Sequence, residues 1–158
     1  MKIVKNKIMK LNKFLVKAKK NTYASNGEGG EKKLEDGTKE LTYIEGEYKY
    51  RDRYFGNRAF IGQEIVWQNG KAVWGMNYYG RMLSDSIDME KLYSFLKKAL
   101  LKVNELKPFR GPEILDEGDF LYGSSTYGSL KDFHGEEGIF YLNHKVYRLW
   151  YHGGIIEN

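Results

Sequence analysis

The chain of 158 residues contains no cysteine, two prolines and three histidines. The lack of cysteine excludes disulfides, thiolate metal ligands and cysteine nucleophiles. The histidines, His134, His144 and His152, show neither HxxxH nor HExxH spacing, so we expect no metal and no cofactor. The first 20 residues have no acidic side chain and no long apolar run, unlike a signal peptide or a membrane span. We therefore expect a cytoplasmic protein without a membrane partner.

Positive charge is concentrated at the N-terminus. The formal net charge is +5, yet residues 1–20 carry eight lysines, so the remainder of the chain is acidic. Lysines on the outward face of a helix are usually solvated surface residues. The sequence as a whole thus argues against a nucleic-acid partner, although binding through this segment stays open as an alternative.

The sequence contains a similar unit twice. KLNKFLVKA at residues 10–18 recurs as KLYSFLKKA at residues 91–99, and residues 60–80 align without a gap onto residues 133–153. In both short segments apolar residues recur at i, i+3, i+4 and i+7, which predicts amphipathic helices. Aromatic and β-branched residues alternate with polar ones after each helix, which predicts strands. Within the first run, Asn69-Gly70 is a hairpin signal.

These elements predict an α+β fold with an internal duplication. Each unit holds one helix and three strands, mainly antiparallel, and residues 2–5 could add a short leading strand. Two helices that are apolar on one side must cover one face of the sheet, which gives a two-layer sandwich with a pseudo-twofold axis. We predict a single domain over residues 1–158, with repeats at about 10–80 and 91–153. Residues 25–30 (SNGEGG), continuing through charged residues to Glu40, predict a flexible loop.

The last strand of each unit separates the two faces, because side chains alternate along a strand. One parity is large and apolar in both units, and we assign it to the core: Trp74, Met76 and Tyr78 match Tyr147, Leu149 and Tyr151. The other parity places Asn77 and Tyr79, with Trp150 and His152, on an open face. Such a mixture of aromatic and polar groups suits a ligand surface.

Two acidic residues, Glu64 and Glu137, occupy matching positions near the start of apolar strands. A carboxylate in such surroundings is costly to bury unless it is paired. The two could flank a cleft and attract a cation, or act as general bases. Alternatively, each pairs with a neighbouring basic residue, and Arg51, Arg53 and Arg58 are candidates for Glu64.

Several segments follow one another in a familiar order: FLVKAKKNTYA, EGEYKYRDRYFG, FIGQEIVW, VWGMNYYGR, RGPEILDEGDFLY and VYRLWYHGG. Together they resemble a bacterial family catalogued as a domain of unknown function (number 5680), over residues 11–156. That family often follows an Xre-type helix-turn-helix, which implies a sensor role, although we expect no such module before Leu11. The element order more distantly resembles GyrI-like ligand-binding domains, which implies a central cleft with a Glu and aromatics for cationic compounds.

We therefore predict a small-molecule-binding domain of the sensor type and favour it over an enzyme. Its partner is a small organic ligand, cationic or aromatic. The predicted cleft is lined by Tyr50, Glu64, Trp67, Asn77, Tyr79, Glu137, Trp150 and His152. The alternatives are a hydrolase with Glu64 or Glu137 as general base, and nucleic-acid or protein binding through the Lys-rich N-terminus or the exposed aromatic face. A homodimer also stays open.

Overall fold

A computed structural model describes residues 2–22 and 31–157, with side chains from residue 10 onward. Residues 25–30 of the predicted loop lie outside this part of the chain, whereas the continuation of the loop to Glu40 was predicted wrongly in part, because residues 32–33 and 39–40 lie in strands. The elements follow in the order α1 (Lys2–Asn21), β1 (Lys32–Lys33), β2 (Lys39–Glu45), β3 (Tyr48–Gly56), β4 (Ala59–Gln68), β5 (Lys71–Met82), α2 (Met89–Leu100), β6 (Ile114–Glu117), β7 (Phe120–Ser129), β8 (Asp132–Tyr141) and β9 (His144–Ile155).

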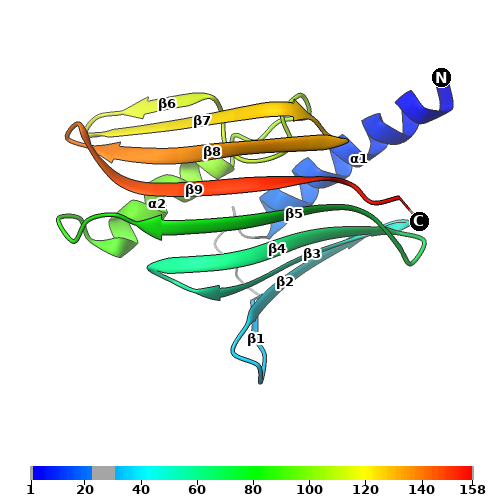
Figure 1. Cartoon of the computed structure of the whole chain (residues 1–158), viewed down its shortest axis with the longest axis horizontal. Coiled ribbons are helices and arrows are strands. Elements are labelled where there is room, and N and C mark those ends of the chain that lie inside the picture. Colours follow the sequence, from blue (N-terminus) through cyan, green and yellow to red (C-terminus); the bar gives the residue numbers. More distant parts are fainter. Residues whose placement is uncertain (1, 23–30, 158) are drawn as a thin grey trace.

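The strands of the described residues form one nine-stranded antiparallel sheet (Figure 1). Its order is β1-β2-β3-β4-β5-β9-β8-β7-β6. Tight hairpins connect the strands within β2–β5 and within β6–β9, and the central pair β5–β9 joins the two halves of the chain. In that pair Tyr78 lies opposite Tyr151, and Tyr79 lies opposite Trp150.

Local sequence explains the central hairpins. Asn69 and Gly70, between β4 and β5, have φ angles of 49° and 79°, the left-handed conformation that a type I′ turn requires. This confirms the predicted hairpin turn. The equivalent turn between β8 and β9 uses Leu142 and Asn143, with φ angles of 48° and 65°.

Alternation along the strands gives the sheet two different faces. We call the face with the buried aromatic and aliphatic side chains the inner face, and the opposite one the outer face. The predicted core set is confirmed, because its members are all buried: Trp74, Met76, Tyr78, Tyr147, Leu149 and Tyr151. Helix residues join the same core: Phe14 of α1 stacks on Tyr48 with 5.0 Å between ring centroids, and Phe95 of α2 stacks on Phe120 at 4.7 Å.

The predicted two-layer, GyrI-like sandwich of repeated helix and strand units is wrong. A single continuous sheet dominates the described chain, while α1 mainly contacts β2 and β3 and α2 contacts β7. The physical reason is that each strand pairs with its neighbour through a hairpin and that β5 then pairs with β9. The β5 edge of one half and the β9 edge of the other are thereby hydrogen-bonded to each other within one sheet. The single domain and its repeat boundaries stay a prediction.

The N-terminal segment also differs from expectation. Residues 2–5 belong to α1 rather than to a leading strand, because residues 2–9 contain no proline or glycine that would stop the helix. Among the described residues, neither helix combines the length and apolar character needed to cross a membrane.

Candidate functional site

Among the described residues, five acidic or basic side chains are buried on the inner side of the sheet. They are Lys19, Asp52, Glu64, Arg110 and Glu137, none more than 5% exposed. A buried charge is strongly destabilising unless an opposite charge and hydrogen bonds compensate it. The way in which these five are paired therefore decides what the site can do.

Glu137 and Arg110 form a fully hydrogen-bonded pair. Arg110 Nε and Nη2 donate to the two Glu137 carboxylate oxygens over 3.0 and 2.6 Å. The hydroxyls of Tyr122 and Tyr147 also donate to Glu137, over 2.6 and 3.0 Å. Burial raises the pKa of both tyrosines, and the charge of Glu137 raises it further, so both hydroxyls remain protonated donors. This arrangement compensates both charges.

Glu64 and Lys19 form the second buried ion pair, between β4 and α1. The Lys19 ammonium also lies 5.9 Å from the centroid of the Trp74 ring. Burial lowers the pKa of Lys19, and the Glu64 carboxylate opposes that shift. The second oxygen of Glu64, Oε1, is buried without a hydrogen-bond partner among the described residues.

The arginines expected to neutralise Glu64 lie elsewhere. Arg53 binds Glu40 over 2.8 Å, Arg58 binds Asp85, and Arg51 lies over the ring of Trp67. Arg51 and Arg53 have the opposite strand parity from the buried residues of β3, so they project from the outer face. Sequence proximity was therefore a poor guide to the partner of Glu64.

Asp52 differs from the other two buried acids. Asp52 on β3 is the register partner of Glu64 on the neighbouring strand β4, and it is 3% exposed. The hydroxyl of Tyr78 donates to it over 2.6 Å, but no ion pair to Asp52 exists among the described residues. Burial, and then the charge of Glu64, raise the pKa of Asp52 to about 7. Asp52 therefore changes its charge near neutral pH.

Asp52 lies at a cavity of about 610 Å³. Strands β2–β5, helix α2 and Arg110 supply its walls, and its lining residues are Glu31, Lys39, Leu41, Asp52, Tyr54, Gly56, Asn57, Phe60, Tyr78, Met89, Tyr93, Leu96, Lys97, Leu100 and Arg110. Asp52, Tyr78 and Arg110 are the buried polar residues of this lining, and we call these three residues the floor of the cavity. Volumes of this size suit small organic ligands.

The floor of the cavity is connected to the buried ion pairs. The Arg110 guanidinium, held by Glu137, lies 6.0 Å from the centroid of the Tyr78 ring. Tyr78 in turn binds Asp52, and Asp52 neighbours Glu64 in the sheet. A charge at Asp52 therefore interacts electrostatically with Glu64, Lys19 and Arg110. Arg110 is already matched by Glu137, so Asp52 is the buried acid of the cavity lining that has no ion pair among the described residues.

The structure divides the eight predicted site residues between the two faces of the sheet. Tyr50, Glu64 and Glu137 are buried on the inner face. The others follow the outward parity of their strands: Trp67, Asn77, Tyr79, Trp150 and His152. None of the eight belongs to the lining of the cavity. Glu137 binds the floor residue Arg110, and Glu64 is the register partner of the floor residue Asp52. Their role in ligand binding stays a prediction.

Sequence reasoning missed Asp52, Tyr78 and Arg110 as site residues. For Asp52 a signal was present, because it shares the parity of Tyr48 and Tyr50, so a carboxylate was placed on a core face. Arg110 gave no such signal, because it lies in the proline-flanked connector after α2. Its neighbour Glu137 is 27 residues away in the chain.

Comparison with known proteins adds a family but no activity. The family described as a domain of unknown function (DUF5680) matches residues 52–156, which is more than half of the chain, so the chain belongs to this family. The match begins at Asp52 and includes Tyr78, Arg110 and Glu137, whereas Lys19 lies before it. No curated protein and no solved structure matches the chain.

Proposed function

We propose that this member of the DUF5680 family is a small-molecule-binding domain of the sensor type, which takes an organic cation into the cavity above Asp52. One observation carries the proposal: Asp52 is a buried carboxylate at the floor of a 610 Å³ cavity and has no ion-pair partner among the described residues. A ligand cation would supply the missing charge. Because burial raises the pKa of Asp52 to about 7, bringing a cation close stabilises the ionised form that the protein alone disfavours.

The remaining lining supports an aromatic or amphipathic ligand. Tyr54, Phe60, Tyr78 and Tyr93 contribute ring surfaces to the cavity wall. A cation held against such rings gains about 0.5 to 2 kcal/mol per favourable contact. The apolar side chains of α2 add a surface for the rest of the ligand. Charge selectivity would thus come from Asp52 and affinity from the rings.

The hydrolase alternative has less support. A general base needs a free oxygen within reach of a water molecule or substrate. Both oxygens of Glu137 accept hydrogen bonds, and neither Glu137 nor Glu64 belongs to the cavity lining.

The proposal is tested with a matched pair of probes, 2-phenylethylammonium and the uncharged 2-phenylethanol, in isothermal titration calorimetry. We expect the amine to bind more tightly than the alcohol by tenfold or more, which corresponds to about 1.4 kcal/mol. The preference should grow between about pH 6 and pH 8, because Asp52 becomes ionised over that range while the amine remains protonated.

Two carboxylate variants make the test specific. Asp52→Asn should remove both the preference for the amine and its pH dependence, because it keeps the side-chain shape without the charge. Asp116→Asn, at an exposed position of β6, makes the same chemical change away from the cavity and should leave both unchanged. Equal affinity of the wild-type protein for amine and alcohol, or a wild-type preference in Asp52→Asn, would show that the proposal is wrong.

A further inference from the structure

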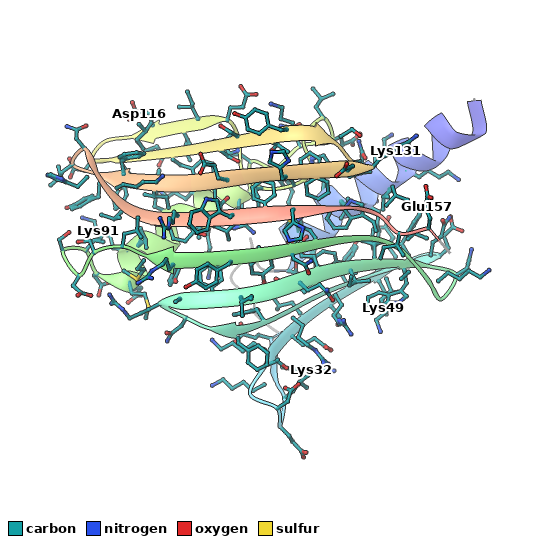
Figure 2. The ribbon with its side chains drawn as sticks, viewed as in Figure 1. Lys32, Lys49, Lys91, Asp116, Lys131 and Glu157 are labelled. Carbon is teal, nitrogen blue, oxygen red and sulfur yellow. The ribbon has the colours of Figure 1, made fainter. Side chains whose placement is uncertain are left out.

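The outer face of the sheet carries exposed aromatic rings across its central strands. Tyr79 of β5 and Trp150 of β9 are register partners, 38% and 44% exposed. Next to them His152 pairs with His134, and His134 pairs with Tyr127, whose ring stacks on His134 with 5.5 Å between centroids. Figure 2 looks onto this face, where rings and nitrogen-bearing side chains stand along the central strands.

Basic side chains accompany these rings. The Arg148 guanidinium lies 4.2 Å from the centroid of the Trp150 ring, and that of Arg51 lies 5.0 Å from the Trp67 ring. By strand parity and register, the outer face of β2–β5, β8 and β9 holds six basic residues, Lys49, Arg51, Arg53, Arg81, Lys145 and Arg148, against three acidic ones, Glu40, Asp132 and Glu136. Since Glu40 is occupied by Arg53, a positive excess remains.

We propose that this outer face binds single-stranded nucleic acid. Bases would stack on Tyr79 and Trp150, and phosphates would contact Arg81 and Arg148, which are register partners beside those rings. Proteins that bind single strands combine a basic surface that follows the backbone with rings on which bases stack. The proposal is independent of the cavity, because Asp52 and the outer face lie on opposite sides of the sheet.

Charge and ring geometry favour this occupant over two others. A second copy of the chain would bring the same excess of arginines against itself, which is repulsive. An acidic protein segment would satisfy the arginines, but it would leave the exposed rings of Tyr79 and Trp150 without the flat partners that bases provide. A single strand satisfies both features at once.

Two lysines of α1 already pair with acidic residues of the sheet. Lys17 is paired with Glu45 over 2.6 Å, and Lys19 is buried with Glu64. In the sequence, positive charge is evident only in the first 20 residues, because the arginines of the outer face are dispersed along the chain. The sheet gathers them: Arg81 and Arg148 lie opposite each other although 67 positions separate them in the sequence.

Fluorescence anisotropy with labelled oligo(dT) and oligo(U) of about 15 nucleotides tests the proposal at about 50 and 200 mM salt. Trp150→Ala should weaken binding roughly tenfold through lost stacking, whereas Trp150→Phe should retain most of the affinity. Arg81→Gln/Arg148→Gln should also weaken binding and should reduce the slope of log K against log salt by about 1.4. The control Lys13→Gln/Lys20→Gln removes two exposed charges from α1 and should retain the wild-type affinity and slope.

Four results would overturn the proposal. The first is the absence of saturable binding to both oligonucleotides at the lower salt. The second is an equal loss of affinity in the α1 double variant, which would place the strand on the helix. The third is full competition by polyglutamate at matched charge, which would indicate an acidic protein partner. The fourth is concentration-dependent dimerisation that Trp150→Ala abolishes, which would make the face an interface between copies. Circular dichroism of each variant distinguishes loss of binding from loss of fold.

Discussion

Replacing Asp52 by Asn should change how the stability of the protein depends on pH. The pKa of Asp52 is about 7 in the folded chain, against an ordinary value of 3.8 that applies when the chain is unfolded. Between these two values the folded protein holds a proton that the unfolded chain releases. The free energy of unfolding must therefore fall as pH rises through this range.

The size of the effect follows from the same shift. About three pKa units at about 1.4 kcal/mol each correspond to on the order of 4 kcal/mol over the whole range. Between about pH 5 and pH 8, where unfolding is easily measured, roughly 3 kcal/mol of this falls within the window. Asn does not titrate, and its side-chain oxygen can still accept the hydrogen bond from Tyr78. Asp52→Asn should therefore gain stability over the wild type as pH rises.

Urea unfolding followed by tryptophan fluorescence at several pH values measures this difference directly. Contributions from distant titrating groups cancel when the variant is subtracted from the wild type at each pH, so the difference reports Asp52 together with the buried charges that interact with it, Glu64, Lys19 and Arg110. Asp116→Asn serves as the control, because its exposed carboxylate should leave the wild-type pH profile unchanged. A wild-type profile in Asp52→Asn, or a difference that shrinks as pH rises, would refute the assignment of a raised pKa to Asp52.

Two further predictions concern the buried cluster and the packing beneath the cavity. Lys19→Met should lower the free energy of unfolding by about 3 to 5 kcal/mol at neutral pH, because Glu64 is left buried without its partner. Adding Glu64→Gln should recover much of that loss, as measured by chemical denaturation. If the effects of the two substitutions simply add, the ion-pair argument is wrong. Gly62→Ala should destabilise the protein and weaken its binding of the amine, because the added methyl group would lie 2.4 Å from the Tyr78 hydroxyl oxygen. The control Gly123→Ala should have neither effect, because the nearest atom to its added methyl group is 3.8 Å away. Equal thermal stability of the two variants would argue against this packing.

Local sequence signals predicted some of the elements, although the three strands expected after each helix are, among the described residues, five after α1 and four after α2. The Asn69-Gly70 turn and the buried parity of β5 are confirmed, because both depend on a few consecutive residues and on the alternation of a strand. The layer arrangement was wrong, since the pairing of Tyr78 with Tyr151 joins the halves in one sheet and depends on residues 73 positions apart. No local pattern encodes such a pairing.

The candidate site shows the same division. Sequence parity could place Asp52, Glu64 and Glu137 on a core face, yet it could not provide their partners. Lys19 and Glu64 meet across 45 positions, and Arg110 and Glu137 meet across 27. The consequence for Asp52, a carboxylate left without a cation, appears only once the other two acids have been paired in space.

By itself, the sequence determined the two amphipathic helical segments, the apolar side of β5 and β9 and the turn at Asn69-Gly70, because these properties arise within a turn or a few alternating residues. The tertiary structure decided which strands are neighbours, which charges compensate one another and which remain available. Those outcomes depend on contacts between distant residues. The same sheet that places Asp52 beside Glu64 on one face brings Arg81 and Arg148 together on the opposite face.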